Sequence, residues 1–112
     1  MAKYEDRVHG DFLQILTRLQ ADIQQSGLSV NLVDQSDYEL ADVKVAVRVY
    51  DKYFMRNGNR ASLSLTLVGR DDEIFISAIG AGGGSGSIFN FSLGAESELA
   101  NVVADSIYRM KR

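Results

Sequence analysis

The sequence predicts an α+β fold: one strand, one helix, four or five antiparallel strands and a last helix, with both helices on one face of the sheet. Three observations predict it. Over residues 43–67 valines and then leucines alternate with other residues, and near residues 11–26 and 95–111 apolar residues recur every three or four positions. The alternation has the period of a strand, and the two stripes have the period of a helix.

Composition sets limits on domain number and on chemistry. The 112 residues fit one domain spanning 1–112, and 46% of them are hydrophobic. The chain has no cysteine, which excludes disulfides and thiolate metal sites. No apolar run approaches the ~20 residues of a membrane span, and the first residues lack the apolar core of a secretory signal. We therefore expect no membrane contact and a cytoplasmic location.

The first third of the chain predicts an edge strand followed by a helix. Residues 3–9 alternate in polarity, which is typical of a short edge strand. Asp11 precedes the helix, and Gln14 follows three residues later, as in a capping box. The apolar stripe of this helix consists of Phe12, Ile15, Leu16, Leu19 and Ile23. Gly27 is the predicted stop after residue 26.

Residues 28–40 predict the next strand, interrupted by a polar run at 34–37. Such a run indicates either a β-bulge or a polar segment within one strand. If Ala41 and Asp42 form a two-residue loop, Leu40 pairs with Val43 and Tyr38 with Val45. The apolar faces of the two strands then coincide, which supports this pairing.

The turn near Asn57 and Gly58 decides the register of the central hairpin. A three-residue loop, 56–58, pairs Val49 with Leu65 and brings the apolar faces of both strands together. This register predicts a type I turn with Gly58 left-handed in a G1 bulge. The first strand then has a valine face, made of Val43, Val45, Val47 and Val49, which we expect to point toward the helices.

The last third predicts two further strands and a helix. A turn at 69–72 leads to a strand at 73–79. This strand is apolar on both faces, so the pattern does not indicate which face points toward the core. A glycine-rich loop covers residues 80–86, and Ile88, Phe89 and Phe91 indicate a short strand. A helix from about residue 95 to 111 follows, with acidic residues in its first turn and basic residues in its last.

Two resemblances follow from these segments. The order of elements is similar to the helix-grip arrangement of the TATA-binding-protein fold. The segments MAKYE at 1–5, GDF at 10–12, AVRVY at 46–50, GNR at 58–60 and SAI at 77–79 resemble an uncharacterised bacterial family of small proteins. That resemblance implies a soluble intracellular protein from a family with a domain of unknown function and carries over no catalytic residue.

A ligand pocket is one functional hypothesis. The predicted registers place Asp34, Ser36 and Asp51 on the core side of the sheet, where carboxylates need partners. A small-molecule pocket between sheet and helices would explain them, with Gly82, Gly83 and Gly84 as a lid over it. The competing interpretation is a bulge near Gln35 that turns Asp34 to solvent. The glycine loop lacks the spacing of a dinucleotide fingerprint and the lysine of a P-loop.

An uncovered sheet face is the second hypothesis. In the predicted register no helix is left to cover the face opposite the valines, and such a patch marks an interface, here of a homodimer. Its residues are Ala46, Arg48, Tyr50, Phe54, Ser62 and Thr66. Basic residues alternate with aromatics on the same strand, as in single-strand nucleic-acid binders, but a net charge of −3 disfavours that class.

The sequence nominates no catalytic residue, metal ligand or cofactor. His9 is the single histidine, so a second histidine for a metal site is missing, and the pattern indicates no histidine base for any of the serines. We therefore expect a small non-enzymatic binding module for a ligand or protein partner. The alternative is a homo-oligomeric interaction protein using the exposed sheet face. An enzyme comes third, and a single-strand nucleic-acid binder is the less favoured form of the binding hypothesis.

Overall fold

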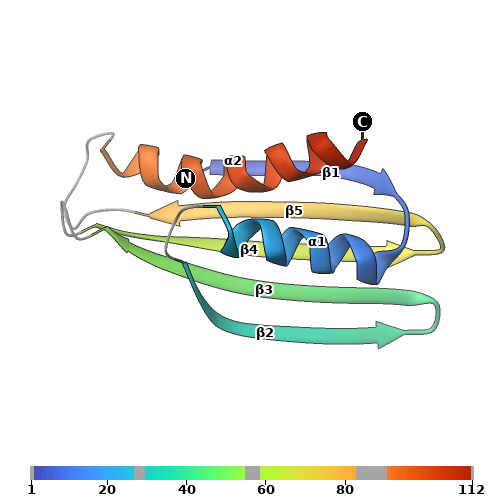
Figure 1. Ribbon diagram of the computed structural model, residues 1–112. Coiled ribbons are helices and arrows are strands. Elements are labelled where there is room, and N and C mark those ends of the chain that lie inside the picture. The colour runs from blue at the N-terminus through green and yellow to red at the C-terminus, as the bar shows by residue number, and fades with distance from the viewer. Residues whose placement is uncertain (1, 27–29, 55–58, 83–90, 112) are drawn as a thin grey trace.

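The computed structural model describes residues 2–26, 30–54, 59–82 and 91–111. The elements run β1 (Ala2–His9), α1 (Phe12–Gln24), β2 (Asn31–Leu40), β3 (Val43–Phe54), β4 (Asn59–Arg70), β5 (Glu73–Gly82) and α2 (Phe91–Lys111) (Figure 1). Within these residues, five strands form one antiparallel sheet. The predicted α+β class and order of elements are confirmed.

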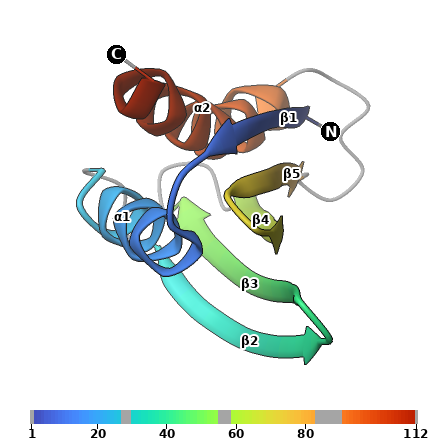
Figure 2. The same cartoon turned by 90° about the vertical axis from the view of Figure 1, so that its right-hand side faces the viewer.

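The strand order is β1-β5-β4-β3-β2. The last strand, β5, therefore pairs with the first, β1, and the two edges of the sheet are β1 and β2. Both helices pack against one face of this sheet (Figures 1 and 2). We call that face the inner face and the opposite one the outer face. The core between helices and sheet is formed by Leu16, Leu19 and Ile23 of α1, Leu99, Val103 and Ile107 of α2, and Leu63, Leu65, Leu67, Ile74 and Ile76 of the sheet.

Helix α1 forms as its sequence predicts. The Asp11 carboxylate accepts a hydrogen bond from the backbone N–H of Gln14 at 2.9 Å and caps the first turn. Leu16, Leu19 and Ile23 are buried at helical spacing. The helix ends at Gln24, and the predicted stop at Gly27 lies outside the described residues.

Helix α2 begins earlier than predicted. It starts at Phe91, so the assignment of that residue to a short strand is wrong, and the rest of that segment lies outside the described residues. Arg109 and Lys111 occupy the last turn, where positive charge complements the helix dipole.

The β2–β3 hairpin confirms the predicted register. Leu40 pairs with Val43, and Ala41 reaches a φ of 53° in the two-residue turn between them. A bulge interrupts the pairing between Leu32 and Asp34, close to the predicted polar interruption. Because the bulge inserts one residue, Asn31 rather than Leu32 pairs with Asp51.

The β3–β4 register differs from the prediction by one residue. Phe54 pairs with Asn59, so four residues connect the strands instead of three. Arg48 pairs with Leu65 and Val49 with Ser64, and the predicted Val49–Leu65 pair is therefore wrong. The predicted turn with a left-handed Gly58 lies outside the described residues.

This offset reverses the faces of β3. Leu65 points inward and is fully buried, and its inward neighbours on β3 are the even-numbered Ala46, Arg48 and Tyr50. The valine face consequently lies on the outer side of the sheet and is half-buried. The prediction assumed that β3 has one apolar face, but the Tyr50 ring and the Arg48 stem make the second face buriable as well.

Gly69 provides the space that the start of α1 needs. It lies on the inner face of β4, and a Cβ there would be 2.5 Å from Cδ1 of Phe12. We expect Gly69→Ala to lower the free energy of unfolding by about 1–2 kcal/mol, because the ring must leave its packed position. Urea denaturation measures this effect. In a Phe12→Ala background the cost should nearly vanish; an equal cost in both backgrounds would exclude this contact as the cause.

A polar cluster ties the end of α2 to β1. The Tyr4 hydroxyl donates to Oδ2 of Asp6 at 2.9 Å, and Nζ of Lys111 donates to the same oxygen at 2.7 Å. The hydrogen bond from Lys111 holds the pKa of Asp6 below its ordinary value. Burial, together with the Asp6 carboxylate, raises the pKa of Tyr4 to about 12.

The shifted Tyr4 pKa predicts a loss of stability in alkali. The unfolded tyrosine releases its proton near pH 10.0, whereas the folded one keeps it to about 12. Since the native state then binds the extra proton, the free energy of unfolding should fall as the pH rises through this window. Urea denaturation below and above pH 10.0 measures the loss, and it should be smaller in Tyr4→Phe. An identical loss in both proteins would show that other groups cause it.

Candidate interaction surface

The outer face of the sheet is not covered by either described helix (Figures 1 and 2). Alternation along the paired strands brings one set of side chains to this face. They include Lys3, Glu5 and Arg7 of β1; Glu73, Phe75, Ser77 and Ile79 of β5; Ser62, Ser64, Thr66, Val68 and Arg70 of β4; Val43, Val45, Val47, Val49 and Asp51 of β3; and Asp34, Ser36, Tyr38 and Leu40 of β2.

The centre of the outer face carries no charge. Val45 lies opposite Val68, Val47 opposite Thr66 and Val49 opposite Ser64. On either side of this centre large apolar side chains remain accessible: Tyr38 and Leu40 are 61% and 62% exposed, and Phe75 and Ile79 are each 37% exposed. An apolar surface this extended is typical of a protein-binding site.

Charged groups lie at the margins of the outer face. On the β1 edge, Lys3 and Arg7 flank Glu5, which accepts a hydrogen bond from the Ser77 hydroxyl at 3.1 Å. On the β2 edge, Asp34 is exposed. An uncharged centre with a polar margin is the usual anatomy of a protein interface.

The predicted interface residues divide between the two faces. Ala46, Arg48 and Tyr50 are 1%, 6% and 2% exposed beneath the helices, so the prediction that they are exposed is wrong. Burial raises the pKa of Tyr50, and the charge of Arg48 offsets part of this shift. Ser62 and Thr66 are half-buried on the outer face, and Phe54 is the last residue of β3.

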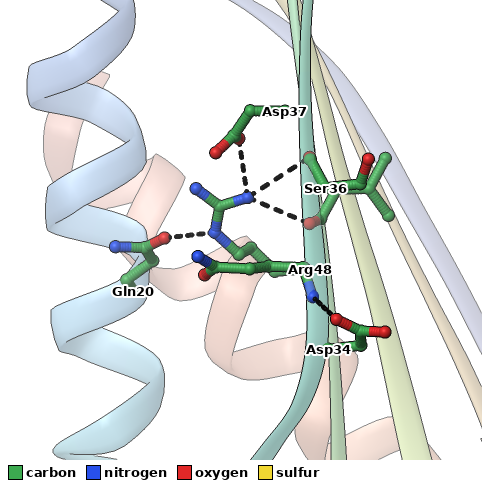
Figure 3. A network of polar contacts seen from close by, with 7 residues as sticks. Gln20, Asp34, Ser36, Asp37 and Arg48 are labelled. Atoms are coloured by element: carbon green, nitrogen blue, oxygen red, sulfur yellow. Dashed lines mark hydrogen bonds and ion pairs between the residues drawn. The ribbon is translucent and has the colours of Figure 1, made fainter.

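Arg48 connects three elements instead of forming a surface (Figure 3). Its Nε donates to Oε1 of Gln20 on α1 at 2.5 Å, and its Nη1 donates to Oδ1 of Asp37 on β2 at 2.8 Å. The same Nη1 donates to the carbonyl oxygen of Val47 at 3.0 Å. These bonds give partners to Nε and Nη1 of a buried guanidinium, and they hold the edge strand β2 to the helix. The nucleic-acid hypothesis requires an exposed row of basic and aromatic side chains on β3. Arg48 and Tyr50 are buried, so they cannot contribute to such a surface.

The predicted pocket residues also lie on the outer side. Asp34 and Ser36 pair with Val49 and Val47, as predicted, but both are exposed. The carboxylate of Asp34 accepts a hydrogen bond from the backbone N–H of Gln35 at 2.8 Å (Figure 3), and that of Asp51 lies 3.9 Å from Nη1 of Arg60. The placement on the core side is wrong, because Asp34 and Ser36 follow Val49 and Val47 to the outer face. A bulge does lie next to Asp34, between Leu32 and Asp34, but the reversed faces of β3 rather than this bulge bring Asp34 to solvent.

The glycine loop contributes little to a described site. Gly82 ends β5, with space for a Cβ limited by the carbonyl oxygen of Arg60 at 3.1 Å. Gly83 and Gly84 lie outside the described residues. In the part of the chain that the structure describes, no three histidine, aspartate or glutamate side chains are grouped as a metal site requires.

Over its described residues, neither helix has the combination of length and apolar character that a bilayer crossing requires.

Comparison with known proteins places the chain in a family. A search of curated proteins found no match. One family model, described as a family of unknown function (DUF6054), matches residues 1–111. The chain therefore belongs to the DUF6054 family.

Proposed function

We propose that the protein is a small non-enzymatic interaction module that binds a second copy of itself through the outer face. The observation that carries the proposal is the uncharged centre around Val47 and Thr66, left open by both helices and bordered by charge. Burying half-exposed valines in a partner releases about 25 cal/mol for each Å² of apolar area removed from water.

The size of the outer face suits a stable dimer. Five strands of about ten residues cover roughly 30 Å by 24 Å. This area is near the ~800 Å² that each partner buries in a standard interface. Two sheets packed through such faces form a sandwich with about 10 Å between them.

The strand order favours one arrangement of the two copies. A two-fold axis along β4, the middle strand, places β3 of one copy over β5 of the other and β2 over β1. The valine face then meets Phe75 and Ile79, and the exposed Asp34 approaches the Lys3 and Arg7 edge. A two-fold axis perpendicular to the strands would instead place β2 of one copy over β2 of the other. The two acidic β2 edges would then repel each other, which disfavours this arrangement.

Several finer assignments belong to this proposal. The element order and the sheet order support a helix-grip arrangement. A bacterial, cytoplasmic setting is proposed from the sequence resemblance alone. Neither nucleic acid nor a small molecule at Asp34, Ser36 and Asp51 has comparable support, because the outer face has no cluster of basic residues at its centre and these three side chains line no described cavity.

Val47→Lys is the variant that tests the dimer. The side chain of Val47 is half-exposed in one copy, so a lysine there leaves the fold intact. In the dimer, the same ammonium group would be buried without a partner, and we expect at least a tenfold weaker association. Sedimentation velocity across a wide range of protein concentrations measures it.

Leu13→Lys is the matched control. Leu13 lies on α1, away from the outer face, and is 67% exposed, so this substitution adds the same charge without affecting association. The proposal fails if the wild-type protein is monomeric at every concentration, or if Val47→Lys dimerises as tightly as Leu13→Lys.

A further inference from the structure

A cleft at one end of the molecule lies apart from the centre of the outer face and shares Arg7 with the margin of that face. The end of β1, the first half of α1 and the end of α2 meet there, as Figures 1 and 2 show. The cleft has a volume of about 500 Å³. This lies within the range of about 300–1,000 Å³ typical of small-molecule sites.

Basic side chains outnumber acidic ones in the lining of the cleft. Four basic side chains line it, namely Arg7, Arg18, Arg109 and Lys111, against one carboxylate, Asp11. The Asp11 carboxylate already accepts a hydrogen bond from the backbone N–H of Gln14. Three further carboxylates, those of Asp6, Asp22 and Glu73, pair with these cations from outside the lining. What the cleft offers an anionic ligand is therefore a set of partly paired cationic donors rather than a large net charge.

Asp22 holds the two central guanidinium groups from behind the cleft. Its Oδ2 accepts from Nε of Arg18 on α1 at 3.3 Å and from Nη2 of Arg109 on α2 at 3.4 Å. The hydroxyl of Ser106, which is fully buried, donates to the same oxygen. One carboxylate thus orients two cations and neutralises only one of them. The side chains of Arg18 and Arg109 are each 52% exposed, and their guanidinium groups have further N–H donors that these bonds do not use.

We propose that this cleft binds a small phosphate-bearing anion. A phosphate offers several oxygens with two negative charges, which match guanidinium groups arriving from two different helices. Lys111 and Arg7 add charge at the margin, although each is also paired with a carboxylate, Asp6 at 2.7 Å and Glu73 at 3.8 Å. Ile15 and Met110 provide an apolar wall for the carbon skeleton of a phosphate ester. The site does not depend on dimerisation.

Amide NMR titration of the full chain tests the site. Inorganic phosphate and glycerol phosphate are the two probes, and sodium chloride at equal ionic strength is the reference. We expect saturable shifts at the backbone amides of Gln14, Ile15 and Arg18, and tighter binding of the ester if the apolar wall contributes. Non-saturating shifts equal to those with chloride would overturn the proposal.

Arg109→Gln should weaken phosphate binding by about tenfold or more, because it removes one charged donor. Arg70→Gln is the matched control, since Arg70 forms an exposed ion pair with Asp42 at 3.0 Å and does not line the cleft. Equal binding by the two variants would also overturn the proposal. Arg18→Gln supplies a second test if Arg109→Gln lacks a native amide spectrum, since Asp22 then still holds Arg109.

Discussion

Replacing Ala46 with aspartate is expected to lower the free energy of unfolding by about 3–5 kcal/mol, a large part of the stability of an ordinary domain. Ala46 is 1% exposed on the inner face of β3, with Leu67 beside it on β4. A carboxylate there would be buried without a cationic partner built for it. Thermal and urea denaturation followed by circular dichroism measure the change.

The adjacent Val47→Asp provides the comparison. It places the same carboxylate one residue along the strand, on the half-exposed outer face, and should cost under ~1 kcal/mol in the monomer. The two variants introduce a carboxylate at neighbouring positions that point to opposite faces of the sheet. If Val47→Asp were the more destabilising of the two, the faces of β3 would be the reverse of those described.

Arg48→Ala is expected to cost about 2–4 kcal/mol of stability. The substitution removes a buried aliphatic stem and the hydrogen bonds that connect Gln20 on α1 with Asp37 on β2. Every residue of the edge strand β2 is exposed, so its pairing with β3 depends on such connections. Urea denaturation gives the total cost, and hydrogen exchange along β2 shows where protection is lost.

Two variants separate packing from charge at this position. Arg48→Met retains most of the stem and should recover part of the loss. Asp37→Asn should cost under ~1 kcal/mol, because the Asp37 side chain is 60% exposed and solvent screens its ion pair. If Asp37→Asn were as costly as Arg48→Ala, the ion pair rather than the buried stem would stabilise this region.

Local patterns predicted most elements of this fold. The cap at Asp11 and the stripe through Leu16, Leu19 and Ile23 suffice for α1, because both the cap and the amphipathic face are set within a few residues. The two-residue turn before Val43 likewise fixed the register of β2 and β3. Each of these features is short-range, and tertiary packing does not override it.

The orientation of the central strands could not be predicted in the same way. Both faces of β3 offer enough apolar area to be buried, so one residue more in the connection to β4 is enough to exchange them. What favours the observed face is long-range: Gln20, 28 positions away, accepts a hydrogen bond from the Arg48 guanidinium. No pattern within the strand records that partner. For this reason Ala46, Arg48 and Tyr50 of the predicted interface, and the predicted pocket residues Asp34 and Ser36, were assigned to the wrong face.

The basic cleft was equally inaccessible to sequence patterns. Arg18 and Arg109 are separated by most of the chain. They meet because the first and last strands, β1 and β5, are paired in the sheet and both helices pack on its inner face. Along the sequence each appears as an ordinary exposed charge on a helix. The one available signal was a buried serine, Ser106, within the apolar stripe of α2.

Thiol labelling of single-cysteine variants tests the assignment of the outer face most directly, because the natural chain contains no cysteine. The thiol of Val47→Cys should react rapidly in dilute solution and progressively more slowly as the protein concentration rises and dimers form. The thiol of Ala46→Cys should react slowly at every concentration, since that position is buried under the helices. Faster labelling of Ala46→Cys than of Val47→Cys in dilute solution, or a Val47→Cys rate independent of concentration, would contradict the account.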